Sequence, residues 1–506
     1  MIRSLCALLL ALAMLTGCAL GEDAPAQPAS GVTYEIFVAS FQDSDGDGRG
    51  DLRGVIDRLD YIESLGVSRI WLMPVHPSVS YHKYDVMDYC AIDPAYGTMA
   101  DFDALTAACR ERGIGVTLDL VVNHTSKLHP WFLEACKALQ DGIDSPYISW
   151  YNFTRGEGQH PVAGTDWYYE GQFGDHMPDL NLDNPDVRSE IARIIRFWQE
   201  HGVTGFRLDA VTSYYTGAND SICDFLTFVC DTARAYDPDC RIVGEVWSDE
   251  GTILDLYRSG IDSLFNFPFS DNNGAFVQAA LNAKGAAAAR LLAEWNGKVK
   301  AVSPLSVDAP FLTNHDQARS AGMLRLKAPF EKTAAMLYLL SPGCPTVYYG
   351  EELGMTGSGK DENKRLPMVW SAEEGAALCN PPADADQNQR LKEGVDVQDG
   401  NPDSLLNWYR QLIALRSLAP ELIRGSMTAI DPGNPAVACW RVEDEGSAVL
   451  VLVNTHQTET VTVSLADAGS LTLLGSVQAP DAPAPVLAED GSVSLPAVSC
   501  MLVRAE

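Results

Sequence analysis

Short apolar runs alternate with amphipathic segments over most of this chain. Eight of these runs have the length and composition of buried strands, and they lie at 33–40, 68–74, 115–122, 205–209, 241–245, 263–267, 310–313 and 345–349. The segments between them, such as 187–200, place apolar residues three and four positions apart, as a helix with one buried face does. Regular alternation of strand and helix favours parallel βα units. We therefore expect an α/β fold, a (β/α)8 barrel formed by residues 33–126 and 179–420.

Two stretches break this alternation. Residues 127–178 are rich in Trp, Tyr, Gly and Pro without clear periodicity, and a structureless loop of that length is uncommon in a compact domain. We expect a small inserted domain there, after the third strand. Beyond residue 420 the pattern changes to short alternating strands, which predicts a C-terminal antiparallel β-sandwich domain at 421–506. The expected strands of this domain are 436–441, 448–454, 459–464 and 498–503.

The start of the chain has the features of an export signal. Arg3 precedes an apolar run at 5–15, which is too short for a transmembrane helix. The Leu-Thr-Gly-Cys ending resembles a bacterial lipoprotein cleavage site, so residues 1–17 would be removed and Cys18 would carry the lipid. Residues 18–32 are too poor in large apolar side chains to fold and would form a tether. We expect an exported protein that contacts the bacterial cell membrane only through lipidated Cys18.

The composition of the chain indicates which kinds of molecule the protein is expected to bind. The chain has 506 residues and a formal net charge of −32, which argues against nucleic acid and suits an exported protein with a neutral substrate. Of its twelve cysteines, ten follow Cys18, several of them inside apolar runs, and no CxxC or zinc-type spacing occurs. Most are therefore expected to be buried apolar side chains, and the sequence leaves any disulfide pairing open.

Two carboxylates end neighbouring apolar runs, Asp209 at the end of 203–209 and Glu245 at the end of 241–245. A charge at the C-terminal end of a buried strand is costly unless it has a function. In a barrel these strand ends surround one pocket, so both side chains would point into it. Two carboxyl groups across a sugar linkage, one ionised and one protonated, are the groups that hydrolyse glycosides. The pattern therefore predicts a glycosidase.

Four short motifs at the ends of expected strands carry a family resemblance. They are Asp119-Leu-Val-Val-Asn123-His124, Gly205-Phe-Arg-Leu-Asp209, Gly244-Glu245-Val-Trp247 and Phe311-Leu-Thr-Asn-His315-Asp316. With these motifs in this order, the chain resembles the α-amylase family, glycoside hydrolase family 13, from about Tyr34 onwards. The segment Met177-Pro-Asp-Leu-Asn181 is similar to the motif of the intermediary group between oligo-1,6-glucosidases and neopullulanases.

The resemblance implies that Asp209 is the nucleophile, Glu245 the general acid/base and Asp316 the third catalytic carboxylate. Arg207 stands two positions before Asp209, so both side chains leave the strand on the same side. Its guanidinium would lower the pKa of the Asp209 carboxyl and keep it ionised for attack. The apolar neighbours of Glu245 would raise its pKa, as a proton donor requires.

Further residues are implied to bind the sugar whose bond breaks. His124 and His315 would donate hydrogen bonds to its hydroxyl groups, and such bonds tighten as the ring flattens. Tyr84 matches the family tyrosine that stacks on the same sugar, with its aromatic face against the C–H face of the pyranose. Together with Arg207, these residues form the expected substrate-binding set.

The segment 43–51 predicts a metal site. It places carboxylates at alternate positions with glycines between them, a pattern that surrounds a hard cation with oxygen atoms. It also matches the metal loop that follows the first barrel strand in some members of the resembled family. The expected ligands are the side chains of Asp43, Asp45, Asp47 and Asp51 and the backbone carbonyl of Arg49. We expect one structural Ca²⁺, with Mg²⁺ as the alternative, because the ligands are many and all come from the protein.

These features together predict a retaining α-glucan hydrolase of the α-amylase type. It would cleave α-1,4-glucosidic bonds of starch or maltooligosaccharides through a covalent glucosyl–Asp209 intermediate. An exo-acting α-glucosidase or a transglycosylase of the same family is the alternative, because loop shape decides between these activities. A sugar-binding protein that has lost catalysis is a further alternative, against which the intact carboxylates argue. The sequence leaves the oligomeric state open.

Overall fold

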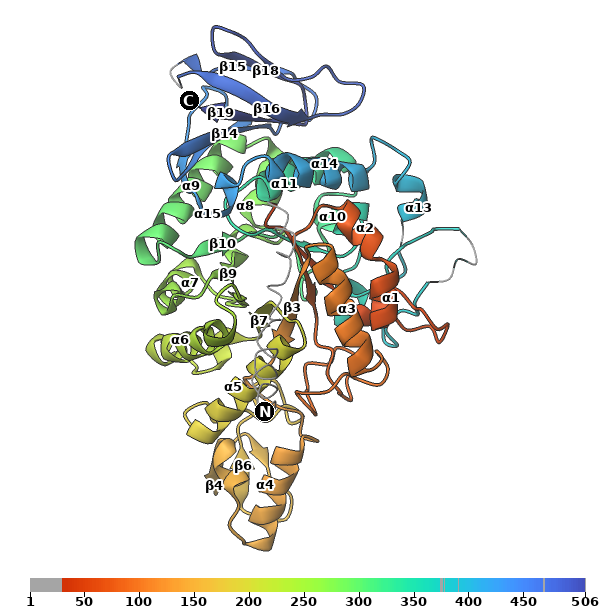
Figure 1. Cartoon of the computed structure of the whole chain (residues 1–506), viewed down its shortest axis with the longest axis vertical. Coiled ribbons are helices and arrows are strands. Elements are labelled where there is room, and N and C mark those ends of the chain that lie inside the picture. The colour runs from red at the N-terminus through yellow and green to blue at the C-terminus, as the bar shows by residue number, and fades with distance from the viewer. Residues whose placement is uncertain (1–29, 374–375, 377, 390, 467–468, 506) are drawn as a thin grey trace, which may run out of the picture.

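The computed structural model describes residues 30–505, apart from 374–375, 377, 390 and 467–468, so the expected signal peptide and the predicted lipidation site Cys18 lie outside the described residues. Eight parallel strands form one sheet in the order β10-β9-β8-β7-β3-β2-β1-β11, at the centre of the molecule (Figure 1). These strands are β1 (Thr33–Ile36), β2 (Arg69–Leu72), β3 (Gly115–Leu120), β7 (Gly205–Leu208), β8 (Arg241–Gly244), β9 (Ser263–Phe265), β10 (Val307–Ala309) and β11 (Thr346–Tyr348).

Backbone hydrogen bonds join the two ends of this sheet into a barrel. The N–H of Thr346 donates to the carbonyl of Pro310 at 2.9 Å, and the N–H of Cys344 donates to that of Asp308 at 2.8 Å. Seven of the eight barrel strands lie within the ranges predicted from the sequence, but the prediction of a strand at 310–313 is wrong. The seventh barrel strand is β10, three residues earlier, because Pro310 has no N–H to contribute to the ladder. The predicted barrel is confirmed.

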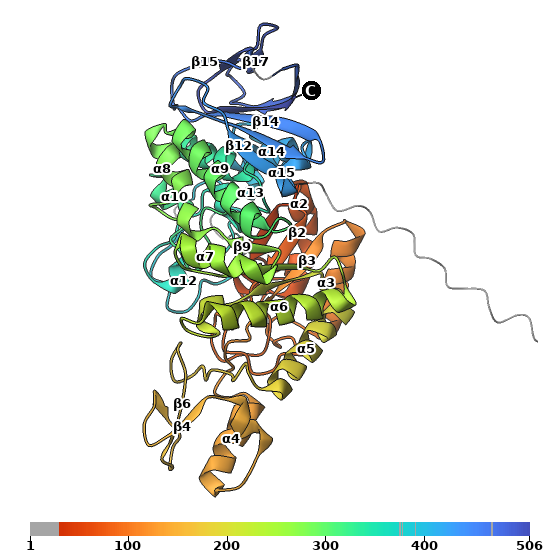
Figure 2. The same cartoon turned by 90° about the vertical axis from the view of Figure 1, so that its left-hand side faces the viewer.

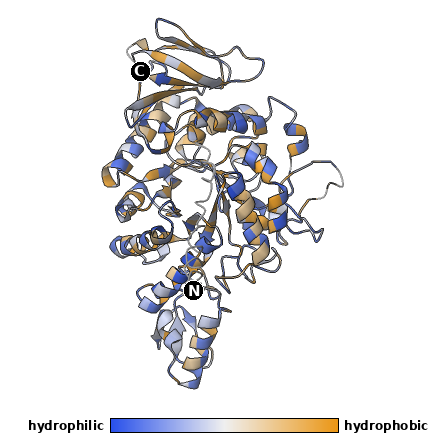
Figure 3. Cartoon of the chain, viewed as in Figure 1, coloured by the Kyte–Doolittle hydropathy of each residue, from blue (hydrophilic) through white to orange (hydrophobic). Residues whose placement is uncertain are grey.

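Helices surround the strands, and most carry apolar residues on one side and polar residues on the other (Figures 2 and 3). The helix expected at 187–200 is α5 (Pro185–Glu200), which is capped by the Asn184 side chain accepting the N–H of Asp186 at 2.8 Å. The other helices around the barrel are α1 (Leu52–Asp57), α2 (Leu59–Ser64), α3 (Met99–Glu111), α6 (Asn219–Tyr236), α7 (Glu250–Leu256), α8 (Ala275–Asn282), α9 (Gly285–Val302), α10 (Ser320–Met323), α11 (Ala328–Leu339), α12 (Asp361–Lys364), α13 (Val395–Gln398), α14 (Leu405–Ser417) and α15 (Glu421–Arg424).

A separate lobe, formed by residues between β3 and α5, lies at one end of the molecule (Figure 1). It contains helix α4 (Pro130–Asp141) and a three-stranded antiparallel sheet of β4 (Phe153–Arg155), β5 (His160–Pro161) and β6 (Trp167–Tyr169). Edge-to-face contacts of Phe132 with Tyr151 and Tyr169 form its aromatic core. Because the aromatic residues pack on one another instead of repeating at a helical period, the sequence shows composition without periodicity here.

The C-terminal region is a β-sandwich at the opposite end (Figure 1). Its five-stranded sheet has the order β12-β13-β14-β19-β16, and its second sheet has the order β15-β18-β17. The two sheets enclose a separate apolar core, while the outer face of the larger sheet packs on α9 and α14. The strands are β12 (Ser426–Ala429), β13 (Val437–Asp444), β14 (Ser447–Asn454), β15 (Val461–Ser464), β16 (Leu471–Val477), β17 (Val486–Leu487), β18 (Ser492–Leu495) and β19 (Ser499–Ala505).

Arg416 of α14 joins the start of the described chain to the barrel. Its guanidinium is fully buried and donates hydrogen bonds to the backbone carbonyls of Ser30, Leu339, Ser341, Gly343 and Leu422. Five carbonyl acceptors satisfy the buried donors, and burial lowers the pKa of Arg416 to about 10, so the side chain stays charged at neutral pH. None of the described helices has the length and apolar character needed to cross a membrane.

Candidate active site

A cavity of about 490 Å³ opens at the carboxyl ends of the barrel strands. Asp209 directly follows β7, Glu245 directly follows β8, and Asp316 lies on the loop after β10. Other lining residues are His82, Tyr84, His124, Phe173, His176, Met177, Ala210, Thr212, Ser213, Trp247, Asp361 and Arg365. The structure thus brings together the three carboxylates named from the sequence, and places Tyr84 and His124 in the wall of the same cavity.

Arg207 of β7 links the carboxylates beneath this cavity. It is 1% exposed, and its Nη1 donates to Oδ1 of Asp209 and to Oδ1 of Asp119, both at 2.7 Å. Its Nη2 lies 2.7 Å from Oε2 of Glu245. The prediction that Arg207 and Asp209 project to the same side is therefore confirmed. Because Asp209 and Glu245 contact one planar guanidinium, their carboxyl groups face the same small space.

Burial sets the protonation of these two carboxyls. It raises the pKa of Asp209 to about 6, and the opposing effect of Arg207 is smaller. Arg207 lowers the Asp209 pKa, as expected, but the net shift is upward because burial outweighs it. Burial also raises the pKa of Glu245, as expected; Arg207 opposes this rise, and the negative charge of Asp209 adds to it. At neutral pH Asp209 is still largely ionised, and its charge favours a proton on Glu245.

The backbone at Ala210 orients Glu245. Ala210 has a φ of +46°, in the left-handed region that few residues other than glycine adopt. In this conformation its N–H donates to Oε2 of Glu245 at 2.9 Å. Both Ala210 and Arg207 contact Oε2, so Oε1 is the oxygen left to carry the proton. Backbone strain at a position like this is typical of functional sites.

His315 and Asp316 form the other charged part of the site. His315 is fully buried, with its Nδ1 at 2.5 Å from Oε1 of Glu35 and its Nε2 at 3.1 Å from Oδ2 of Asp316. Burial lowers the pKa of His315, but Asp316 and Glu35 outweigh it and raise that pKa to about 10. Burial works to raise the pKa of Asp316, but His315 and Arg365 hold it well below its usual range. Asp316 is therefore the firmly ionised carboxylate of the three.

Tyr84 and His124 lie beside this group. The Tyr84 ring stacks on His315 at a centroid distance of 5.6 Å and an angle of 15°, and its hydroxyl donates to Oδ2 of Asp119 at 3.1 Å. The Nε2 of His124 lies 3.2 Å from the carbonyl of Tyr84. Burial lowers the pKa of His124 to about 4, so the ring is neutral and this nitrogen donates to the carbonyl. Both rings are thereby fixed in the cavity wall.

Aromatic side chains stand exposed at the cavity rim. Phe173, from the inserted lobe, is 44% exposed, and Trp247 is 52% exposed. Trp247 stacks on Phe267 at a centroid distance of 5.1 Å and an angle of 14°, which holds its free face toward solvent. Rigid aromatic faces of this kind suit the apolar faces of sugar rings.

Three residues of the site were not singled out from the sequence. Glu35 is a single charge inside the apolar run 33–40, and that isolation was a signal in the same sense as for Asp209. Asp119 opens one of the family motifs, but its contacts with Arg207 and Tyr84 depend on β3, β7 and the loop after β2 meeting. Arg365 donates to Oδ1 of Asp316 at 2.8 Å from an irregular segment, where no pattern indicates its position.

The loop 43–51 gathers part of the expected metal site. Asp43, Asp45 and Asp51 each offer a carboxylate oxygen within 4.8 Å of the others, a hard donor set that fits Ca²⁺. Asp47 is not part of this group, and its Oδ1 accepts the N–H of Arg49 at 2.7 Å. Burial opposes it, but backbone N–H groups of the loop lower the pKa of Asp43, so its carboxylate is ionised.

Residues 35–425 match the family model described as alpha amylase, catalytic domain. The chain is 37% identical over 444 residues to alpha-amylase 3 of Dictyoglomus thermophilum, with 85% of each protein covered. It is 32% identical over 504 residues to trehalose-6-phosphate hydrolase of Escherichia coli, covering 84% of this chain and 90% of that protein. Among solved structures, Eubacterium rectale Amy13B superposes with a TM-score of 0.88 at 40% identity, covering 94% of this chain and 95% of that one. The barrel, the clustered carboxylates and these matches together show that the chain belongs to the α-amylase family and is a glycoside hydrolase.

Proposed function

We propose that this protein hydrolyses α-1,4-glucosidic bonds of starch or maltooligosaccharides by double displacement, with retention of configuration. The observation that carries the proposal is the contact of one guanidinium, Arg207, with both Asp209 and Glu245 at 2.7 Å. Retaining glycosidases hold their two carboxyl groups about 5–5.5 Å apart, whereas inverting ones leave about 6.5–9.5 Å for a water molecule. Because Asp209 and Glu245 both contact the Arg207 guanidinium, the shorter separation of their carboxyl groups, and hence retention, is favoured.

In the first step Asp209 attacks the anomeric carbon while Glu245 gives its proton to the departing glycosidic oxygen. The bond to the leaving group breaks, and an ester forms between the sugar and Asp209. In the second step the ionised Glu245 takes a proton from water, and the water oxygen attacks the same carbon and frees Asp209. The protonation states that these steps need match the pKa shifts of the two carboxyls at neutral pH.

The remaining charged groups would bind the sugar at the reacting centre. Asp316, ionised and exposed to the cavity on one side, can accept hydrogen bonds from two hydroxyls. His315 is a cation whose Nδ1 lies 2.5 Å from Oε1 of Glu35 and whose Nε2 lies 2.8 Å from the Tyr84 hydroxyl and 3.1 Å from Oδ2 of Asp316, so it would hold Asp316 ionised and in place beside the sugar. Tyr84 would present its ring to the sugar.

A second candidate function differs from the first in the length and linkage of the substrate. The E. coli relative is named for hydrolysis of trehalose-6-phosphate, so proteins of comparable likeness differ in substrate. An exo-acting α-glucosidase or a transglycosylase uses the same carboxylates, and the segment Met177–Asn181 supports membership of the intermediary group. We favour α-1,4 hydrolysis because the relative with the higher identity over a similar span is an alpha-amylase.

Two accessory properties complete the proposal. The oxygen cluster of Asp43, Asp45 and Asp51 would hold one Ca²⁺ that stabilises the loop after β1. An ion there would neutralise carboxylates that otherwise repel one another, and the chemical step uses none of these groups. The protein would be exported and anchored through lipidated Cys18, on the strength of the sequence around that cysteine.

The proposal is tested by the products of maltoheptaose. Proton NMR taken during the first turnovers should show the α-anomer of the new reducing end, and chromatography should show maltose and maltotriose from internal cleavage. A β-anomer would contradict retention, and glucose as the first product would support the exo-acting reading. Asp209→Asn and Glu245→Gln, which keep side-chain shape, should each lower kcat at least a thousand-fold while leaving the melting temperature close to that of the wild type. Turnover of either variant near the wild-type rate would contradict the mechanism.

A further inference from the structure

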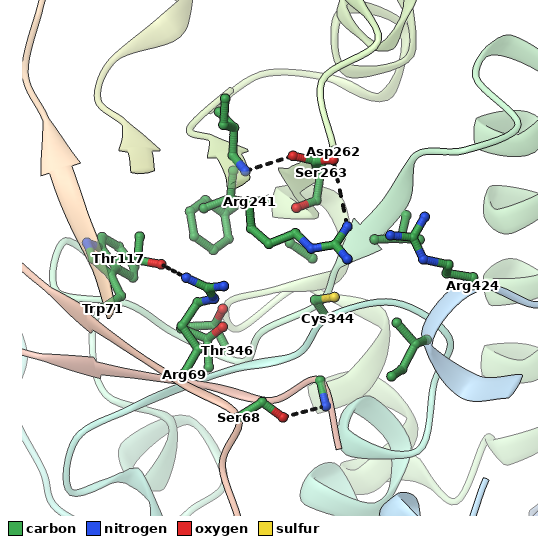
Figure 4. Close-up of a pocket in the computed structure, with 18 of the residues that line it drawn as sticks. Ser68, Arg69, Trp71, Thr117, Arg241, Asp262, Ser263, Cys344, Thr346 and Arg424 are labelled. Carbon is green, nitrogen blue, oxygen red and sulfur yellow. Dashed lines mark hydrogen bonds and ion pairs between the residues drawn. The ribbon is translucent and has the colours of Figure 1, made fainter. Parts of the chain in front are cut away.

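A second cavity, of about 220 Å³, lies at the amino-terminal end of the barrel (Figure 4). Its wall contains residues at the starts of several strands, among them Arg69 of β2, Arg241 of β8 and Ser263 of β9. The candidate active site lies at the carboxyl ends of the same strands. The two cavities are therefore on opposite faces of the barrel, and the catalytic mechanism gives the second one no role.

Arg69 is a buried cation in this cavity without a carboxylate partner. It is 8% exposed, and its Nη1 donates to Oγ1 of Thr117 at 3.2 Å and to Oγ1 of Thr204 at 2.8 Å. Among the described residues, none places a carboxylate within 4.0 Å of Arg69, and none accepts from its Nε or Nη2. Burial lowers its pKa to about 10, so the group is charged at neutral pH. A buried charge without a counter-charge is strongly unfavourable.

The surrounding backbone leaves room for this guanidinium. A Cβ atom added at Gly115 would lie 2.9 Å from Cζ of Arg69, and one added at Gly205 would lie 2.7 Å from its Nη1. The first residues of β3 and β7 thus lack side chains where the guanidinium lies across them. The position of Arg69 is defined by its surroundings, whereas its charge is left unmatched.

Two more arginines stand at the mouth. Arg241 and Arg424 line the cavity and are exposed, and Figure 4 shows both on the side of the cavity away from Trp71. Asp262 is the one carboxylate among the lining residues, and it is shared between Arg234 at 3.0 Å and Arg241 at 3.9 Å. Three guanidinium groups therefore face one carboxylate, in a protein whose formal net charge is −32. The local field favours an anion.

The walls between these charges are apolar. Trp71 and Phe265 lie with ring centroids 5.5 Å apart, and Val243 packs against the same group. Burial raises the pKa of the Cys344 thiol, which keeps it neutral in the wall. An inorganic anion would pair with the arginines but leave these surfaces facing water. A hydrocarbon group would cover them and gain free energy in proportion to the area buried.

We propose that this cavity binds an amphiphilic organic anion, a carboxylate whose charged end pairs with Arg69 and whose hydrocarbon part packs on Trp71, Val243 and Phe265. The planar carboxylate matches the planar guanidinium, with the unused Nε and Nη2 as donors. Arg241 and Arg424 attract the anion at the mouth. The site is independent of glycoside hydrolysis, so its test does not depend on the proposed substrate.

Isothermal titration calorimetry with hexanoate at constant ionic strength tests the proposal on the full chain. We expect saturable binding of one hexanoate per chain and a matching rise in melting temperature. Hexan-1-ol, which has the chain without the charge, and inorganic phosphate, which has charge without a chain, should each bind at least tenfold more weakly. Maltotriose at saturation should leave hexanoate binding unchanged, because it occupies the opposite face.

Variants locate the binding. Arg241→Gln combined with Arg424→Gln changes only exposed side chains and should weaken hexanoate binding about tenfold. Arg155→Gln removes an exposed arginine on the inserted lobe, away from the cavity, and should leave hexanoate binding unchanged. Arg69→Met should abolish binding, and if that variant does not fold, the mouth variant decides. The proposal is overturned if the wild type shows no saturable hexanoate binding, if phosphate binds as tightly as hexanoate, or if the mouth variant binds like the wild type.

Discussion

Removing the charge of Arg207 should shift the pH dependence of activity. Arg207 is 1% exposed and contacts Asp119, Asp209 and Glu245 at 2.7 Å each. An opposite charge this close typically lowers a carboxyl pKa by about 1–3. In Arg207→Met the pKa of Asp209, about 6 in the wild type, should therefore rise above 7. The acid limb of kcat/KM, which needs ionised Asp209, should move to higher pH by at least one unit.

Arg207→Met also leaves three buried carboxyls without their cation. Losing one partner of a buried ion pair typically lowers the free energy of unfolding by about 3–5 kcal/mol. Protonation of the carboxyls would recover part of this, so the melting temperature of Arg207→Met should fall less at pH 5 than at pH 8. The assay is kcat/KM on a chromogenic maltooligoside from pH 4 to 9, with thermal melts at the same values. Arg207→Lys separates charge from geometry, because it keeps the positive charge but replaces the two guanidinium nitrogens that contact the carboxyls by a single ammonium nitrogen. An acid limb that stays near pH 6 in Arg207→Met would refute this account of the site.

Four further outcomes follow from other features. Glu35→Gln removes a charge that raises the pKa of His315, so activity should fall about tenfold and decline further above pH 8, as a kcat/KM profile would show. Burial raises the pKa of Glu351 to about 8; because this exceeds the value of about 4.5 in the unfolded chain, stability should decrease as pH rises from about 5 to 8, and melts of Glu351→Gln should show a smaller decrease. Asp43→Ala should erase the rise in melting temperature that calcium gives the wild type, with activity at low temperature retained. Cys18→Ala should move the protein from the membrane fraction to the soluble fraction. If this variant stayed in the membrane fraction, the proposed lipid anchor would be contradicted.

The barrel could be predicted from the sequence because its strands are short, mostly buried runs with clear ends. The error at β10 shows the limit of that signal, since the apolar residues around Phe311 continue past Pro310, whereas the regular strand ends at Ala309 and is followed by an isolated bridge between Phe311 and Thr346. In the sandwich, the expected strands 436–441, 448–454, 459–464 and 498–503 are confirmed as β13, β14, β15 and β19. Strand β16 was missed because Gly475 interrupts it at a shift in register.

The residues of the candidate active site also differ in how far the sequence could predict them. Residues next to a strand end, such as Asp209 and Glu245, could be placed from the sequence, since the barrel fixes where each strand ends. The protonation of Asp209 could not, because the sequence shows the neighbouring charge of Arg207 and does not show the depth of burial that outweighs it. Arg365 reaches Asp316 from a segment without regular structure, so its role is visible only in three dimensions.

The carbonyl contacts of Arg416 have a consequence for the orientation of the enzyme. By binding the carbonyl of Ser30, Arg416 fixes the point at which the preceding residues join the barrel, and β1 begins three residues later. That point is at the amino-terminal ends of the strands, on the face opposite the catalytic cavity. The barrel therefore separates the place where the preceding residues enter from the catalytic opening. A substrate can approach the carboxylates without passing the point at which the chain enters the barrel.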